Sequence, residues 1–223
     1  MLFTSDADEL EFKELSEAQK IALDEIHSGF KDEKVCLLHG VTGSGKTEIY
    51  VQLIQEQLDL GKQVLFLLPE IALTTQLIQR LSKYFGEQIG VYHSKFNQNE
   101  RVEIWNHVLN NNPSKFRIIL GARSSIFLPF QDLGLIIVDE EHESTFKQYD
   151  PSPRYNARDC SLILANSFGA KVLLGSATPS VETYFNATTG KYGLVEINQR
   201  FGGIQLPEIL IADVKKEHKQ KTM

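Results

Sequence analysis

Short apolar segments alternate with amphipathic segments along most of this chain. A short, continuous apolar run is typical of a strand buried on both faces, whereas apolar residues at every third or fourth position indicate a helix. The predicted strands are residues 34–39, 63–68, 89–92, 116–120, 133–138, 171–174, 192–197 and 209–212. The predicted helices are residues 15–27, 46–60, 71–85, 98–109, 154–166 and 180–186.

This alternation predicts an α/β domain with a mostly parallel central sheet and helices on both faces. In such sheets the functional loops lie at the carboxyl ends of the strands. A length of 223 residues allows one domain with a sizeable core. We expect residues 15–213 to form that domain, with a polar lead-in at 1–14 and a polar tail at 214–223.

Composition excludes several classes of protein. With 42% hydrophobic and 23% charged residues the chain is neither disordered nor fibrous, and its apolar stretches are too short for a membrane span. The acidic start does not resemble a signal peptide. Cys36 and Cys160 are far apart, which favours a reducing, cytoplasmic setting without a disulfide or a zinc site. A net charge of -6 counts mildly against a nucleic-acid partner, although local basic patches decide such binding.

The most specific motif is GVTGSGKT at residues 40–47, between a predicted strand and a predicted helix. It matches a phosphate-binding loop, whose glycines let several backbone N–H groups point at one anion beside a helix N-terminus. Lys46 would reach the β- and γ-phosphates, and the Thr47 hydroxyl would ligate magnesium. The alternative, a glycine-rich turn with an exposed lysine, does not explain the strand–loop–helix context. The predicted nucleotide-binding residues of the loop are Gly40, Thr42, Gly43, Ser44, Gly45, Lys46 and Thr47.

An apolar strand ends in consecutive carboxylates in LIIVDEEH, residues 135–142. Downstream of a phosphate loop, this segment is typical of a Walker B element rather than of an acidic strand end. Asp139 would hold Mg²⁺ through a water, and Glu140 would orient or deprotonate the attacking water. One carboxylate and one hydroxyl suffice, because Mg²⁺ takes few oxygen ligands from protein. The predicted catalytic residues are Lys46, Asp139 and Glu140, and the predicted metal ligands are Thr47 and Asp139.

Further segments narrow the class. GSATP at 175–179 and GARSSIF at 121–127 each follow a predicted strand, and Gln19 precedes the phosphate loop. Together with DEEH they resemble superfamily-two helicases of the DEAH type, and most closely the bacterial primosomal replication-restart helicases. The segments that carry the resemblance are HGVTGSGKTEIY, LLPEIALTTQL, GARSSIFLPF, IIVDEEHESTFKQY, RYNARD and GSATPSVET, between residues 39 and 183.

The resemblance implies a RecA-like phosphate-loop NTPase fold and a role for each matching segment. Gln19 would contact adenine, and residues 69–77 and 121–123 would touch the DNA backbone. Residues 146–158 would sense DNA and signal to the ATP site. The residues that would couple nucleotide state to movement are His142, Ser176 and Thr178.

Aromatic and basic residues interleave in the segment 146–158. Aromatic rings stack on bases and cations meet phosphates without reading the base sequence. The alternatives are a surface loop with buried anchor aromatics and, for Arg123, an ordinary surface ion pair. The predicted DNA-binding residues are Arg123, Phe146, Lys147, Tyr149, Arg154 and Tyr155.

We therefore expect the first motor domain of an ATP-dependent DNA helicase acting at stalled forks in replication restart, with ATP and Mg²⁺ as cofactors. The resemblance implies forked or single-stranded DNA, the primosome and single-strand-binding proteins as partners. It also implies a second motor domain and a zinc-binding region outside this chain, so the isolated domain should hydrolyse ATP poorly.

Three alternatives remain. One is another superfamily-two translocase, in DNA repair, restriction or RNA metabolism. The second alternative is a small-molecule kinase, but GSATP and DEEH would have no role in such an enzyme. The third alternative is a non-catalytic interaction module, and the intact phosphate-loop and acidic residues argue against it.

Overall fold

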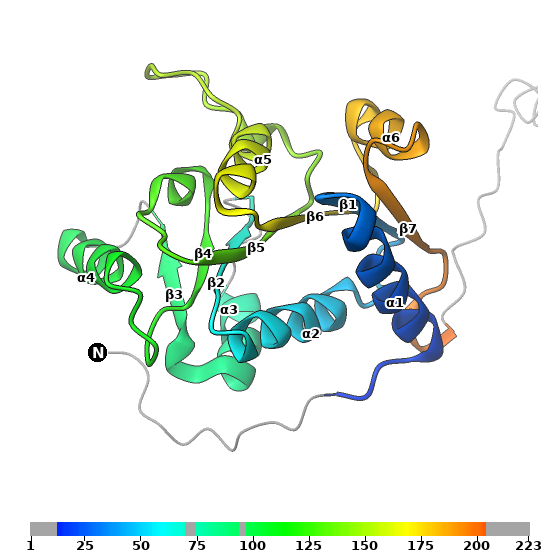
Figure 1. Cartoon of the computed structure of the whole chain (residues 1–223), viewed down its shortest axis with the longest axis horizontal. Helices are drawn as coiled ribbons and strands as arrows, with labels where there is room; N and C mark the ends of the chain where they lie inside the picture. The colour runs from blue at the N-terminus through cyan, green and yellow to red at the C-terminus, as the bar shows by residue number, and fades with distance from the viewer. Residues whose placement is uncertain (1–12, 70–74, 94–96, 204–223) are drawn as a thin grey trace, which may run out of the picture.

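Seven strands form one parallel sheet in this computed structural model, which describes residues 13–69, 75–93 and 97–203. Their order is β3-β4-β2-β5-β6-β1-β7, and each pairing between neighbours is parallel (Figure 1). The predicted mostly parallel sheet is thereby confirmed. The strands are β1 (Val35–Gly40), β2 (Gln63–Leu67), β3 (Ile89–Tyr92), β4 (Ile118–Gly121), β5 (Leu133–Asp139), β6 (Lys171–Ser176) and β7 (Gly193–Ile197).

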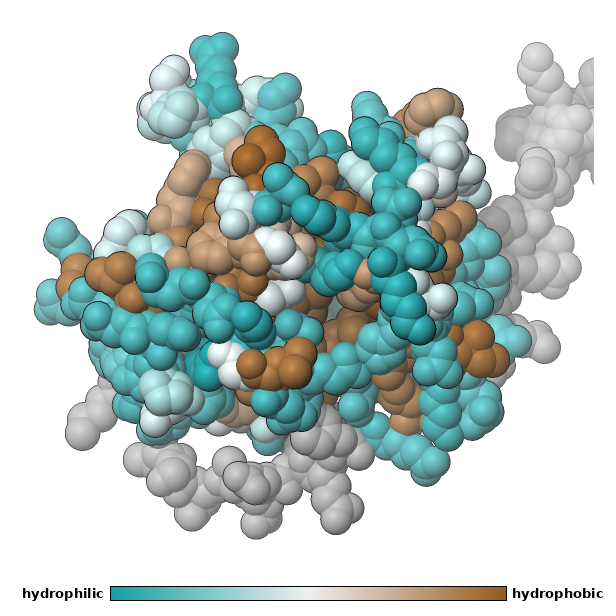
Figure 2. Space-filling view, in the orientation of Figure 1, coloured by the Kyte–Doolittle hydropathy of each residue, from teal (hydrophilic) through white to brown (hydrophobic). Residues whose placement is uncertain are grey.

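Helices cover both faces of this sheet, as the alternating pattern predicts. One face packs against α1 (Glu17–Asp32), α2 (Lys46–Asp59) and α3 (Thr75–Phe85). The other packs against α4 (Gln98–Leu109), α5 (Ala157–Phe168) and α6 (Val181–Thr188). Two apolar cores lie between these layers, while hydrophilic residues cover much of the face seen in Figure 2. Among the described helices, none has the length and apolar character needed to span a bilayer.

Capping residues account for the main differences between predicted and observed helix ends. α1 begins at Glu17 because Ser16 caps it, with a reciprocal pair of hydrogen bonds between Ser16 and Gln19. α5 begins at Ala157 because the Asn156 side chain accepts a hydrogen bond from the backbone N–H of Arg158, two residues further on. The residues before Asn156, predicted as helix, instead belong to a loop. Four predicted segments lie wholly or partly outside the described residues: the lead-in 1–14, the start of the helix 71–85, the strand 209–212 and the tail 214–223.

The strand order brings three functional loops together. β6 lies between β1 and β5, so the loops that follow these strands meet at one edge of the sheet. In register, His39 of β1 pairs with Ser176, and Asp139 of β5 pairs with Gly175. A side chain on Gly175 would collide with the Tyr50 hydroxyl, since a Cβ there would lie 1.8 Å from it. The close approach of β6 to the Tyr50 side chain of α2 therefore favours glycine at 175.

Candidate functional site

The phosphate loop runs from the end of β1 into the start of α2. Gly43 (φ 79°) and Gly45 (φ 82°) have left-handed backbone conformations, which glycine adopts without strain. Gly45 is the N-cap of α2, so the helix N-terminus opens directly onto the loop. The Lys46 ammonium donates a hydrogen bond to the carbonyl of Gly40 over 2.7 Å. The Lys46 side chain thus lies across the loop at which the phosphates are expected to bind.

Gln19 is bonded to the phosphate loop through its side-chain amide. The side chain is only 1% exposed, and its Nε2 donates to the carbonyl of Gly45 over 3.1 Å and to that of Ser44 over 3.5 Å. Its Oε1 accepts from the backbone N–H of Ser16 over 2.9 Å. The amide is thus bonded to the backbone of Ser16 and of the phosphate loop, and the contact of Gln19 with adenine stays a prediction.

A cavity of about 410 Å³ lies over the loop, a size that suits a nucleotide. Arg80 of α3 lines it and forms an ion pair with Glu48. Sequence reasoning missed this pair, because nothing in the local pattern of α3 points to the phosphate loop. The lining residues are Lys13, Glu14, Thr42, Gly43, Ser44, Gly45, Lys46, Thr47, Glu48, Arg80, Asp139, Glu140 and Phe201.

Asp139 stands at the end of β5, facing this cavity. The Tyr50 hydroxyl donates to its Oδ1 over 2.8 Å. Burial raises the pKa of Asp139 to about 6, against the lowering effects of the Tyr50 hydrogen bond and the Lys46 charge. Burial also raises the pKa of Tyr50, so its hydroxyl stays protonated and remains a donor. Tyr50, which lies in the middle of a helix without any motif, was missed from the sequence.

The donor set fits Mg²⁺ bound together with phosphates. A cation beside Asp139 would favour its ionised form and offset the effect of burial. Within the described ranges, no group of three or more histidine, cysteine or acidic side chains could hold a metal. The Asp139 carboxylate and the Thr47 hydroxyl would therefore need ligands from nucleotide and water, as is usual for Mg²⁺.

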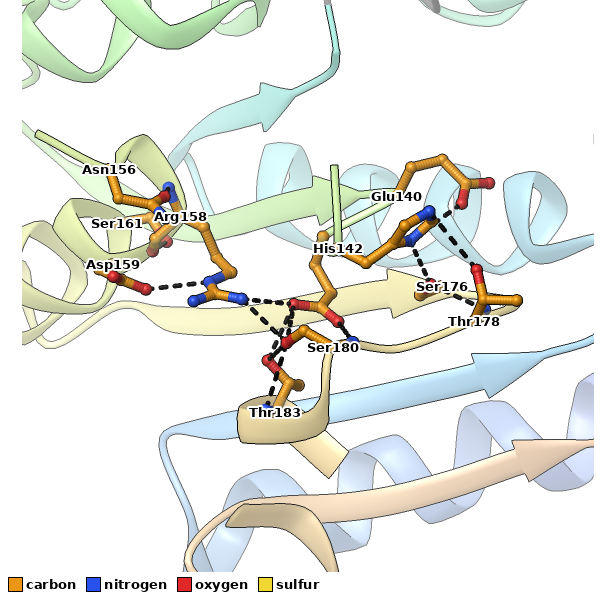
Figure 3. A network of polar contacts seen from close by, with 11 residues as sticks. Glu140, His142, Asn156, Arg158, Asp159, Ser161, Ser176, Thr178, Ser180 and Thr183 are labelled. Atoms are coloured by element: carbon orange, nitrogen blue, oxygen red, sulfur yellow. Dashed lines mark hydrogen bonds and ion pairs between the residues drawn. The ribbon is translucent and has the colours of Figure 1, made fainter. Parts of the chain in front are cut away.

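Glu140 has a backbone φ of 49°, rare for a residue other than glycine. Its Oε2 lies 3.7 Å from Nδ1 of His142. That nitrogen lies 2.8 Å from Oγ of Ser176, and Nε2 of the same ring lies 3.4 Å from Oγ1 of Thr178 (Figure 3). The structure thus brings the three predicted coupling residues together beside Glu140.

Glu141, the second glutamate of DEEH, is buried and joins three elements. Its carboxylate accepts hydrogen bonds from the backbone N–H of Ser180 over 2.6 Å and from Thr183 over 2.8 Å. Arg158 of α5 donates to it over 3.1 Å (Figure 3). Removing one partner from such a buried pair typically costs about 3–5 kcal/mol. Arg158 belongs to the segment 146–158 that was expected to sense DNA, but its side chain ties α5 and α6 to the loop after β5.

The aromatic-rich loop between β5 and α5 forms a hairpin-like finger. Lys147 pairs with Asn156 in an antiparallel bridge, and the Gln148 N–H donates to the carbonyl of Tyr155 over 2.8 Å. Tyr149 is 60% exposed, as expected of a residue that stacks on a base. The prediction for Phe146 is wrong, because its side chain is 1% exposed and packs into the core beneath the loop. Phe146 anchors the finger rather than contacting DNA.

The loops that follow β4 and β5 share one surface. Arg123 donates from its Nη1 to the carbonyl of Lys147 over 2.9 Å. The rings of Phe127 and Tyr155 meet edge to face, 4.9 Å apart. We call this region the finger surface, defined by Arg123, Phe127, Lys147, Tyr149, Arg154 and Tyr155. Phe127 was missed as a candidate, and residues 70–74 of the predicted DNA-contacting segment lie outside the described residues.

Comparison with known proteins identifies the family. The model of the DEAD/DEAH box helicase family matches residues 16–186. The chain is 42% identical over 205 residues to the replication restart protein PriA of Bacillus subtilis, covering 91% of this chain and 25% of that protein. It is 44% identical over 208 residues to PriA of Rickettsia felis, covering 93% of this chain and 31% of that protein. The chain thus spans about a quarter to a third of the length of these relatives.

Solved structures support the same fold. The chain is similar to RecG bound to a three-way DNA junction, with a TM-score of 0.65 and 23% identity over 96% of this chain and 27% of that one. It is also similar to the DUF1998 helicase MrfA bound to DNA, with a TM-score of 0.57 and 16% identity over 83% of this chain and 27% of that one. At these identities the likeness shows a shared RecA-like fold. Taken with the family match and the converging motifs, it leads to one conclusion: the chain belongs to the DEAD/DEAH box helicase family.

Proposed function

We propose that this chain is the first motor domain of an ATP-dependent DNA helicase that acts at stalled forks in replication restart. The observation that carries the proposal is the convergence of Lys46, Asp139 and Glu140 on one cavity. Relatives named for replication restart share 42–44% identity with the chain, which favours this role over that of another superfamily-two translocase.

ATP would lie in the cavity with its phosphates along the loop. Lys46 would neutralise the β- and γ-phosphates, aided by the N–H groups at the start of α2. Mg²⁺, held by Thr47 and Asp139, would neutralise charge on the same phosphates. Glu140 would accept the proton of the attacking water. A nucleotide-dependent movement of Glu140 would reach the loop after β6 through His142, which bonds to Ser176 and Thr178.

DNA would cross the finger surface. Tyr149 and Tyr155 would stack on bases, while Lys147, Arg154 and Arg123 would meet phosphates. The Lys147 ammonium lies 5.0 Å from the centre of the Tyr149 ring, so a cation and a stacking face are presented side by side. Such contacts do not read base sequence, and they weaken as salt rises.

The proposal extends to the complete protein. A second motor domain and a zinc-binding region would lie outside the 223 residues, and the protein would be cytoplasmic. Its partners would be forked or single-stranded DNA, the primosome and single-strand-binding proteins. Exposed apolar residues on α6, among them Val181 and Phe185, are compatible with further domains packing there.

The first test is Lys46→Ala. We expect this variant to bind Mg-ATP roughly ten- to a hundredfold more weakly, because a charge-assisted hydrogen bond contributes about 1.5–3 kcal/mol. Calorimetry on the purified chain measures the change. Lys31→Ala, an exposed lysine near the end of α1, is the matched control and should bind as the wild type does. Equal affinity of the Lys46 variant and the wild type would remove the phosphate loop from the proposal.

The second test concerns the finger surface. Replacing Tyr149 and Tyr155 together with alanine in the complete protein should lower DNA-stimulated hydrolysis more than basal hydrolysis. Loss of stacking on one base costs about 1–3 kcal/mol, so single-strand affinity should fall by roughly tenfold or more. Trp105→Ala, a half-exposed aromatic residue on α4, is the control. If DNA stimulation is unchanged, the finger is only a surface loop.

A further inference from the structure

An exposed aromatic side chain lies beside the phosphate loop without a role in the function proposed above. Phe201 follows β7, and 57% of it is exposed. Its backbone N–H donates to the carbonyl of Gly43 over 2.8 Å. Four residues earlier, the carbonyl of Ile197 accepts from the N–H of Val41 over 3.1 Å. Two backbone hydrogen bonds therefore hold the segment that carries Phe201 against the loop.

Phe201 stands where two cavities meet. It lines the cavity of about 410 Å³ that contains Lys46 and Asp139. It also lines a second cavity of about 230 Å³, whose walls include Ala18 of α1. Ser44 is the other residue common to both. The two cavities are thus neighbours that share Ser44 and Phe201 as walls, and the second lies on the side of β7 and α1.

Two buried polar atoms in this region have no hydrogen-bond partner among the described residues. Ser44 is 3% exposed, and its hydroxyl oxygen is unpaired. The Nε of Arg200, which lines the second cavity, is also buried and unpaired. A buried polar group left unpaired costs about 1–3 kcal/mol, so both atoms indicate a site completed by a polar ligand. An aromatic ring exposed directly beside them adds a stacking face.

We infer that Phe201 is the stacking platform for the nucleobase of ATP and that the second cavity receives the nucleoside. The inference rests on the proposed function, because it presumes phosphates at Lys46. With the phosphates in the first cavity, the nucleoside extends past Ser44 into the second. Gln19 has its amide bonded to the backbone beside this cavity, so stacking of the base on Phe201 would add to any contact that Gln19 makes with the edge of the base. A phenylalanine ring stacks on any base and contributes no hydrogen bond.

Phe201→Ala tests this assignment on the 223-residue chain, by calorimetry with ADP and with inorganic tripolyphosphate. We expect ADP affinity to fall roughly tenfold, the scale of one lost base–aromatic stack, and tripolyphosphate affinity to stay unchanged. Phe201→Trp should keep ADP affinity. Phe185→Ala, which truncates a similarly exposed aromatic residue on α6, should change neither affinity. Because Phe201 is exposed and anchored by its backbone, its truncation leaves the fold intact.

A fluorescence measurement checks the contact directly. The chain has one tryptophan, Trp105 on α4, beside the opposite edge of the sheet from β7. In the double variant Trp105→Phe, Phe201→Trp, ADP should quench the fluorescence and tripolyphosphate should leave it unchanged.

Equal losses of ADP and tripolyphosphate affinity in Phe201→Ala would overturn the inference, because they would show that Phe201 only shapes the loop. Unchanged ADP affinity would overturn it as well, while the proposed function would stand. A wild-type chain that bound neither compound would reject the proposed function and this inference together.

Discussion

The 223-residue chain alone should bind ATP yet hydrolyse it about 10³–10⁵-fold more slowly than the complete protein, without separating DNA strands. Its face of the cavity supplies Lys46, Asp139 and Glu140. Arg80, the arginine that lines this cavity, is engaged by Glu48. In other phosphate-loop enzymes an arginine from a second protein or domain neutralises transition-state charge and contributes about 10³–10⁵ in rate.

Unwinding also requires two DNA-binding surfaces that move relative to each other. The described residues offer one such surface, the finger surface. A conformational change in this chain therefore cannot move it along the DNA strand, because no second surface holds the strand meanwhile. ATP turnover and strand separation, measured for the purified chain and for the complete protein, test this expectation. The Lys46→Ala chain sets the background from contaminating ATPases. Robust ATP-dependent unwinding by the wild-type chain would show that it contains a complete motor.

Glu140→Gln in the complete protein should retain ATP binding and lower the rate of hydrolysis by about 10²–10⁴-fold. The amide has nearly the same shape but cannot accept the proton of the attacking water. Glu140 lines the phosphate cavity and lies beside His142, so its carboxylate is placed for this role. Steady-state turnover and calorimetry on the same preparation separate the loss of chemistry from a loss of binding.

Glu143→Gln is the matched control for this experiment. Glu143 is the next carboxylate after the buried Glu141, and it does not line the cavity of about 410 Å³. Its turnover should equal that of the wild type. If Glu140→Gln hydrolyses ATP at the wild-type rate, another group is the base and the role assigned to this motif is wrong.

The sequence alone determined the fold class and the centre of the nucleotide site. Strands buried on both faces are apolar throughout, and the helices between them carry an apolar stripe, so each element is recognisable from its own residues. The phosphate loop and the acidic motif are equally local, since each occupies a few consecutive residues after one strand. The order of these motifs along the chain therefore sufficed to predict that Lys46 and Asp139 would face one cavity.

Tertiary structure decided what depends on packing between distant segments. Phe146 and Tyr149 look alike in an aromatic-rich stretch, yet one fills the core and the other is exposed. Which aromatic turns inward depends on the space beneath the loop, and no local pattern encodes that space. Likewise the partner of Arg158 is a buried carboxylate from another element.

The contacts of Gln19 and Phe201 with the phosphate loop also join residues far apart in the chain. Gln19 reaches the loop because α1 packs beside it, and Phe201 because β7 adds to the sheet next to β1. Local sequence specified the chemistry that each segment can perform. The packing of strands and helices decided which side chains face the cavity, the core or the finger surface, because burial is a property of the assembled layers.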